Sequence, residues 1–168
     1  MNRFAELLDR LSYEPGRNNK LRLMTDYFAS TRDPERGWAL AALTGALTFQ
    51  QAKPGMVRAL IAERTDPVLF EWSFDYVGDL SETVALMWPA KRSEPLVPPA
   101  LREVVAALSS LGKAALPAML ARWLDALDET GRWALLKLVT GELRVGVSAR
   151  LAKTAAAALG NKAPQRSS

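Results

Sequence analysis

Histidine and cysteine are both absent from this sequence of 168 residues. Their absence excludes a Ser-His-Asp triad, a thiol nucleophile, a Cys/His zinc site, and haem or iron–sulfur ligation through these side chains. No stretch approaches about 18 consecutive apolar residues, the length that a membrane-spanning helix needs, and the first residues lack the apolar run of a signal peptide. Because a chain without cysteine also fits a reducing compartment, we expect a cytoplasmic protein with no membrane partner.

The net charge is only +4, but it is unevenly distributed. Residues 131–168 carry seven Lys or Arg side chains against one acid, Glu142, whereas the first 130 residues have a net charge of −2. A concentrated positive field attracts a polyanion. The C-terminal quarter therefore predicts either a nucleic-acid contact or a basic tail that only aids solubility.

Apolar residues recur at helical spacing along almost the whole chain, as in the stripe of Phe4, Leu7, Leu8 and Leu11. Polar residues that could cap a helix N-terminus precede many of these stripes, and Gly160 is expected to close the last helix. The predicted N-caps are Asp33 and Asp66 (each followed by Pro), Asp79, Asp128 and Ser148. The sequence predicts an all-α fold of about ten helices.

Residues 89–99 contain four prolines and little periodicity. Since proline disfavours helix at the preceding residue, this segment is predicted to connect two halves, residues 1–88 and 100–160. The polar residues 161–168 are expected to form a disordered tail. A chain of this length fits one helical domain spanning residues 1–160.

The two predicted halves share a sequence echo. Residues 33–49 and 128–145 both begin with the pattern Asp-x-x-x-x-Trp-Ala-Leu, at an offset of 95, and both continue into Thr-Gly-x-Leu, at an offset of 96. The echo predicts two pseudo-symmetric helical units. Chance similarity between two amphipathic helices is the alternative.

The segment from Thr140 to Ser148 contains two glycines that bracket Arg144, and it leads into a helix. Glycine permits close backbone approach, a helix N-terminus offers free N–H groups, and an arginine fork suits phosphate. Arg150 and Lys153 oppose the dipole of the following helix, which favours an external anion. The alternative is an ordinary C-cap at Gly141, an ordinary N-cap at Ser148 and a solvated Arg144.

Other features give little evidence of catalysis. Arg17 and Lys20 lie at the start of a predicted helix, where they either meet phosphate or form a polar cap with a surface charge. The sequence has no P-loop, no Gly-x-Gly-x-x-Gly motif and no carboxylate cluster typical of a two-metal site. We therefore expect no catalytic residue and no metal site.

Three segments together resemble the N-terminal DNA-binding domain of ATP-dependent DNA ligases, most closely the bacterial members. The resemblance covers the chain to about Leu159, and its most specific parts are Val-Gly-Asp-Leu at 77–80 and Thr-Gly-x-Leu-Arg-x-Gly-Val-Ser at 140–148. The three segments are residues 4–28, 76–86 and 133–159.

The resemblance implies a pseudo-symmetric helical domain that grips the minor-groove phosphates of nicked double-stranded DNA without sequence preference. It also implies a monomer associated with the bacterial nucleoid, acting in DNA repair, replication or recombination. The loop that helps in relatives offers only Ser110, Gly112 and Lys113 here. The implied DNA-binding residues are Arg17, Lys20, Gly141, Leu143, Arg144, Gly146 and Ser148, to which the residue argument adds Arg150 and Lys153.

Ligases transfer AMP through the lysine of a Lys-x-Asp-Gly motif, and this sequence contains no Asp-Gly pair. The resemblance therefore implies no catalysis and no cofactor in this chain, with ATP and Mg²⁺ belonging to a nucleotidyltransferase domain that this sequence does not include. A different class of function also fits the all-helical pattern and the echo, namely a HEAT-like scaffold that binds protein partners. A salt titration of DNA binding separates the two hypotheses.

Overall fold

The fold is all-α, as predicted. A computed structural model describes the chain except residues 48, 50–51, 90–95 and 163–168 and the side chains of 160–162. This described part contains ten α-helices and no β-strand. In chain order the helices are α1 (Asn2–Tyr13), α2 (Arg17–Ser30), α3 (Glu35–Thr44), α4 (Pro54–Ala62), α5 (Pro67–Val77), α6 (Leu80–Met87), α7 (Leu101–Ser110), α8 (Leu116–Ala126), α9 (Glu129–Thr140) and α10 (Ala149–Lys162).

Local signals place several of the helix starts. The apolar stripe of α1 is buried, with Leu8 and Leu11 fully inaccessible. Four of the predicted N-caps are confirmed, because each side chain accepts a hydrogen bond from a backbone N–H in the first turn. These bonds join Asp66 to Val68 (2.9 Å), Asp79 to Glu82 (2.8 Å), Asp128 to Gly131 (2.8 Å) and Ser148 to Leu151 (3.0 Å).

Two predicted helix boundaries are wrong. Helix α3 begins at Glu35 with Pro34 as its N-cap, and the carboxylate of Asp33 pairs with the Arg36 guanidinium at 3.2 Å instead of capping the helix. Helix α10 does not stop at Gly160 but continues to Lys162. A glycine inside a helix costs only about 1 kcal/mol relative to alanine, a cost that a helix packed on α2 and α3 tolerates.

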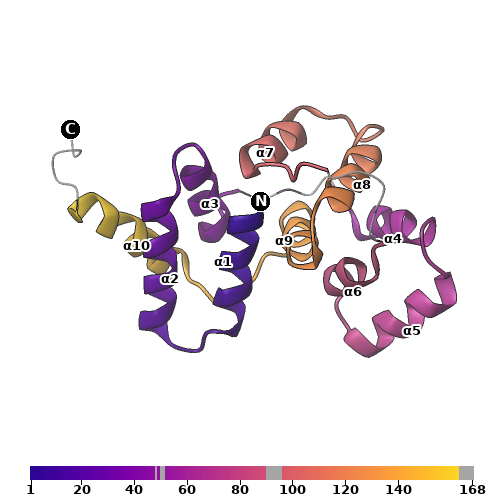
Figure 1. The fold of residues 1–168 in the computed structure, drawn as a ribbon, viewed down its shortest axis with the longest axis horizontal. Coiled ribbons are helices and arrows are strands. Elements are labelled where there is room, and N and C mark those ends of the chain that lie inside the picture. The colour runs from indigo at the N-terminus through magenta and orange to yellow at the C-terminus, as the bar shows by residue number, and fades with distance from the viewer. Residues whose placement is uncertain (48, 50–51, 90–95, 163–168) are drawn as a thin grey trace.

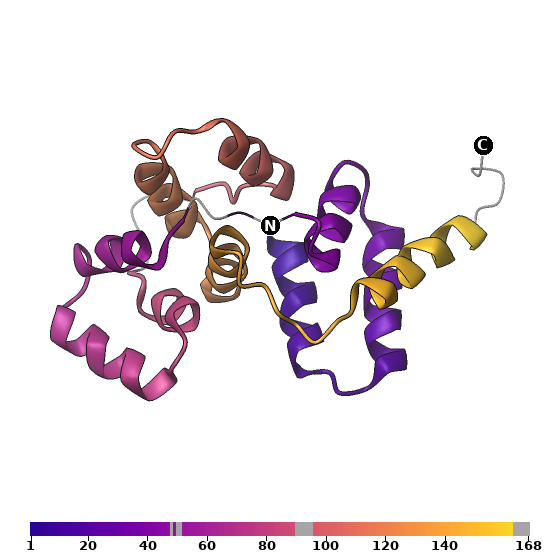
Figure 2. The ribbon, with the colours of Figure 1, turned by 180° about the vertical axis from the view of Figure 1, so that it is seen from behind.

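The last helix returns to the first ones. Helix α10 packs on α2 and α3, and α9 packs between α1 and α6. Figures 1 and 2 show α1, α2, α3 and α10 on one side of α9, with α4, α5, α6 and α8 on the other, while α7 lies above α9 and packs on α3. Packing therefore crosses the predicted boundary at 89–99, and the division into halves 1–88 and 100–160 stays a prediction. Residues 90–95 of the predicted connector and 163–168 of the predicted tail lie outside the described residues.

The two segments of the sequence echo end their helices in the same way. Gly45 after α3 and Gly141 after α9 both adopt left-handed backbone angles, with φ of 80° and 76°. The contacts between helices also correspond in the two units. Helix α1 packs on α9 as α7 does on α3, and α10 packs on α2 as α4 does on α8. Pseudo-symmetry of the two units remains the interpretation that these likenesses favour.

Helix α9 forms the centre of the core. Its side chains at Leu135, Leu136, Leu138 and Val139 are all buried. Arg132 is buried there as well, and its Nε donates to the Leu124 carbonyl oxygen at 2.8 Å. A buried guanidinium needs such acceptors because desolvation disfavours its charge. None of the helices in the described part of the chain has both the length and the hydropathy to cross a bilayer.

Candidate nucleic-acid interface

The 141–148 loop leaves α9 through a tight glycine turn. The Gly141 N–H donates to the Leu138 carbonyl at 3.2 Å, and the Glu142 N–H donates to Lys137 at 3.0 Å. Gly141 is therefore a C-cap whose amide is occupied, and it offers no free N–H to a ligand. A Cβ on Gly141 would lie 2.9 Å from the Phe49 carbonyl oxygen. Glycine is required here by the positive φ and by this close approach.

The amides in the rest of the loop have no hydrogen-bond partner within the described part of the chain. From Leu143 to Ser148, no backbone N–H donates a hydrogen bond to any described residue. Gly146 is exposed, with φ of 70°. A backbone N–H without a partner can donate to an anion where it is exposed, as at Gly146. The Ser148 hydroxyl accepts from the Leu151 N–H, so it acts as the N-cap of α10.

A contact between distant residues fixes the loop against α2. The Lys20 ammonium donates to the Gly146 carbonyl oxygen at 2.8 Å. Figure 2 shows the loop crossing in front of α1, after which α10 crosses in front of α2. The two predicted basic segments, one near each end of the sequence, are thereby brought together.

Arg144 lies at the surface of this loop. Its guanidinium donates to the neighbouring Leu143 carbonyl at 3.1 Å and forms no ion pair with a carboxylate in the described part of the chain. Arg17, Arg150 and Lys153 are also exposed, and none of them pairs with a described acid. We call Arg17, Lys20, Arg144, Arg150 and Lys153, with the 141–148 loop, the cationic surface.

Acidic residues near the cationic surface are few. Glu142 is exposed within the loop. Glu14 accepts from the Gly16 N–H at 3.0 Å, just before α2, which has no side-chain N-cap. The net charge around the loop therefore stays positive.

The apolar residues of the loop hold it to the body of the protein. Val145 is buried, and Leu143, which is half-buried, packs against the core. A hollow of about 230 Å³ lies between this loop and the C-terminal end of α3, at Ala42 and Leu43. The predicted contact residue Leu143 is thus anchored inward rather than freely projecting.

Not every basic residue of the C-terminal quarter is available to a ligand. Two of the seven basic residues in the segment 131–168 are used internally. Arg132 is buried under α8, and Lys137 on α9 pairs with Asp79 at the start of α6. The loop around Lys113 also fails to join the cationic surface, since the turn between α7 and α8 lies at the top right of Figure 1, away from α10. Arg132 and Lys137 differ from Arg144 only in their tertiary contacts, so no local sequence pattern would have shown that they are used internally.

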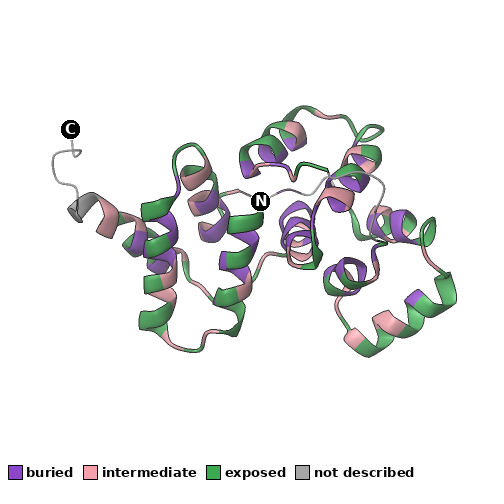
Figure 3. Ribbon diagram, viewed as in Figure 1, coloured by how far each residue is buried: buried purple, intermediate pink, exposed green. Residues whose placement is uncertain are grey.

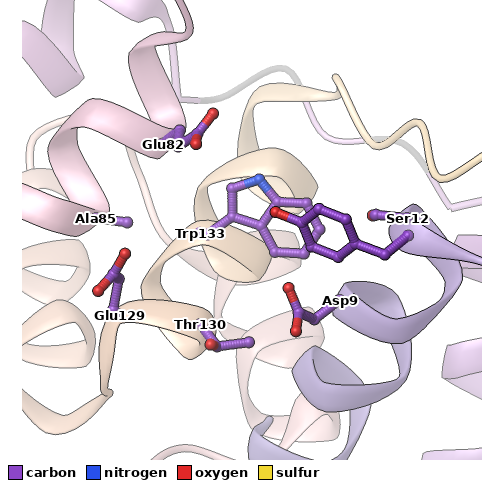
Figure 4. Close-up of a pocket in the computed structure, with 8 residues that line it drawn as sticks. Asp9, Ser12, Glu82, Ala85, Glu129, Thr130 and Trp133 are labelled. Carbon is purple, nitrogen blue, oxygen red and sulfur yellow. The ribbon is translucent and has the colours of Figure 1, made fainter. Parts of the chain in front are cut away.

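A second hollow has the opposite charge. It lies between α1, α6 and α9 and measures about 270 Å³. Figure 4 shows Asp9, Glu82 and Glu129 around the Trp133 ring. These acids belong to no cluster that could hold a metal ion among the described residues. Carboxylates without an added cation repel phosphate, so this hollow does not suit a polyanion.

No protein-family model matches this chain, and no curated protein matches its sequence significantly.

Proposed function

We propose that this chain is a non-catalytic module that binds the sugar–phosphate backbone of duplex DNA without sequence preference. The proposal follows the resemblance to the N-terminal DNA-binding domains of ATP-dependent DNA ligases. In such an enzyme the module would grip the minor-groove phosphates of a nicked duplex while a lysine in another domain receives AMP.

The observation that carries the proposal is the hydrogen bond from Lys20 to Gly146. It joins the basic start of α2 to the loop that bears Arg144, which no described acid neutralises. Arginine and lysine at a surface bind phosphate through charge-assisted hydrogen bonds. Free amides from Leu143 to Ser148 add donors that carry no sequence information.

The distribution of charge supports backbone contact rather than base recognition. Every residue of the cationic surface is a cation or part of a short loop, and cations that contact phosphates carry no sequence information. Binding through phosphates releases counterions, so its affinity falls as salt rises. With about five cations engaged, the slope of log K against log salt would be roughly −4 to −5.

The test measures equilibrium binding of the chain to fluorescent duplexes of two unrelated sequences, each intact and nicked, across a salt series. The expected result is binding to both sequences with equal affinity and with the steep slope given above. A slope near zero would favour the protein-scaffold hypothesis. Binding restricted to one sequence would indicate base readout and would contradict the proposal.

A further inference from the structure

Helix α5 leaves an unusual amount of apolar surface uncovered. Among its eleven residues only Phe70 is buried. Val68, Leu69, Trp72 and Tyr76 are exposed by 61, 54, 71 and 92%. Figure 3 shows α5 mostly in the colour of exposed residues, at the opposite end of the molecule from α10.

These four side chains lie on one face. Because a helix turns by about 100° per residue, positions 68, 69, 72 and 76 fall within an arc of roughly 100°. Phe70 and Phe74 lie on the other side, where their rings stack at 6.2 Å. The exposed stripe is therefore not the edge of the core. We call Val68, Leu69, Trp72 and Tyr76 the apolar face of α5.

Such a face is typical of an interaction site. Single exposed apolar residues are common, but a contiguous group with two aromatic rings marks a surface that another molecule covers. Tryptophan and tyrosine supply most of the binding free energy in many protein interfaces. The exposed rings of Trp72 and Tyr76 would bury the largest area here.

The charge around this face identifies the chemistry of its partner. Residues 66–88, which include α5 and α6, contain five acids and no Lys or Arg, although the whole chain has a net charge of +4. Arg58 neutralises Glu71 at 2.7 Å, and Lys137 pairs with Asp79. Asp75 lies next to Tyr76 and pairs with no cation among the described residues.

This acidity argues against two possible occupants. A second copy placed face to face would set Asp75 and its neighbours against their own equivalents, and like charges across an interface are unfavourable. A nucleic-acid strand stacked on Trp72 would bring phosphates toward the same acids. A positively charged partner meets neither obstacle.

We propose that the apolar face of α5 binds a basic protein segment that brings apolar side chains onto Trp72 and Tyr76 and Lys or Arg side chains toward Asp75. Helix α5 and helix α10, which carries Arg150 and Lys153, lie towards opposite ends of the long axis in Figure 1. The partner therefore binds without competing for the cationic surface. This inference does not depend on DNA binding.

The test uses two synthetic amphipathic peptides as probes, one of leucine and lysine and one with glutamate in place of lysine. Binding of each labelled peptide to the full chain is measured by fluorescence anisotropy. The leucine–lysine peptide is expected to bind at least about tenfold more tightly than its acidic counterpart. Substituting both Trp72→Ser and Tyr76→Ser is expected to weaken its binding by about tenfold or more.

The matched control is Tyr13→Ser, which removes an aromatic ring that is 81% exposed and borders the acidic hollow between α1, α6 and α9. This variant is expected to bind the peptide like the unmodified chain. Circular dichroism verifies that each variant keeps its helices, which is expected because all three side chains are exposed.

Several results would overturn the proposal. These are unchanged binding in the Trp72/Tyr76 variant, a loss of binding in Tyr13→Ser instead, or equal binding of the acidic peptide. Self-association of the chain that disappears in the Trp72/Tyr76 variant, seen by sedimentation velocity, would assign the face to a second copy. Binding of a single-stranded oligonucleotide that disappears in the same variant would assign it to nucleic acid.

Discussion

Lys20 and Gly146 are 126 positions apart, and the Lys20 ammonium donates a hydrogen bond of 2.8 Å to the Gly146 carbonyl oxygen. This hydrogen bond uses one of the three N–H donors of the ammonium group within the protein itself. Lys20 therefore positions the 141–148 loop against α2 in addition to adding charge to the cationic surface.

Replacing Lys20 by methionine keeps the apolar stem and removes the ammonium group. Without this bond the loop loses its anchor on α2, so we expect faster amide hydrogen exchange at residues 143–147. The free energy of unfolding should fall by about 1 kcal/mol. DNA affinity should fall more than in Arg22→Met, an exposed control on the same helix with the same change in charge. Equal effects of the two variants on exchange and affinity would show that Lys20 contributes charge alone.

Gly141→Ala tests how closely the two echo segments approach each other. Alanine at φ of 76° costs about 1–2 kcal/mol, and its Cβ would meet the Phe49 carbonyl oxygen at 2.9 Å. Gly45→Ala is the matched control, because its φ is 80° but no atom lies within 4 Å of the added Cβ. We expect urea unfolding to show a loss at least about 1 kcal/mol larger for Gly141→Ala than for Gly45→Ala. Equal losses would mean that the Phe49 backbone yields without cost.

Arg144→Ala tests the cationic surface directly. Removing a charge-assisted phosphate contact should weaken binding to every duplex sequence by about 1–2 kcal/mol and reduce the salt slope by about 1. Arg122→Ala on α8 removes an exposed arginine on the other side of α9 and should leave binding unchanged. If both variants lose affinity equally, the binding is a general response to net charge.

The ion pair between Asp79 and Lys137 makes stability depend on pH. Partial burial opposes the charged form of Asp79, but hydrogen bonds from Lys137 and from the Glu82 N–H outweigh it, so the pKa of this carboxyl lies below its usual value of 3.8. A depressed pKa in the folded state stabilises the protein at pH values above 3.8. This contribution declines as the pH falls from about 4 through the folded-state pKa.

Asp79→Asn removes the charge and keeps an N-cap, because asparagine caps helices as well as aspartate. Near neutral pH the variant should be less stable by about 1 kcal/mol, a modest value because Asp79 is partly exposed. Urea unfolding from pH 6 down to about 2.5 should show this difference shrinking in the acid range. A difference that is constant across the range would contradict the role of the Asp79 charge.

Incubation with labelled ATP and Mg²⁺ is expected to leave this chain without a covalent adenylate. The 168 residues contain no Lys-x-Asp-Gly motif to accept AMP. The measurement is gel autoradiography after denaturation, with an intact ATP-dependent DNA ligase as the positive control. A labelled band that survives denaturation would contradict the proposal of a non-catalytic module.

The sequence by itself determined the helices and several of their starts. The spacing of Leu8 and Leu11 and the caps at Asp66 and Asp128 act within a few residues, so they depend little on the rest of the fold. Because such signals are local, the sequence around Gly141 and Ser148 fitted two interpretations equally well, helix caps or ligand-binding residues. Their hydrogen bonds show that both residues cap helices, while the amides between them stay free.

Only the tertiary structure decided which charged and apolar side chains face outward. Arg132 and Arg144 look alike in the sequence, yet the first is buried under α8 and the second is exposed. Trp72 occupies a helical stripe as a core residue would, but no other helix covers it. The reason is physical: periodicity gives the faces of a helix, whereas burial depends on which distant helix packs against each face, as α10 does on α2.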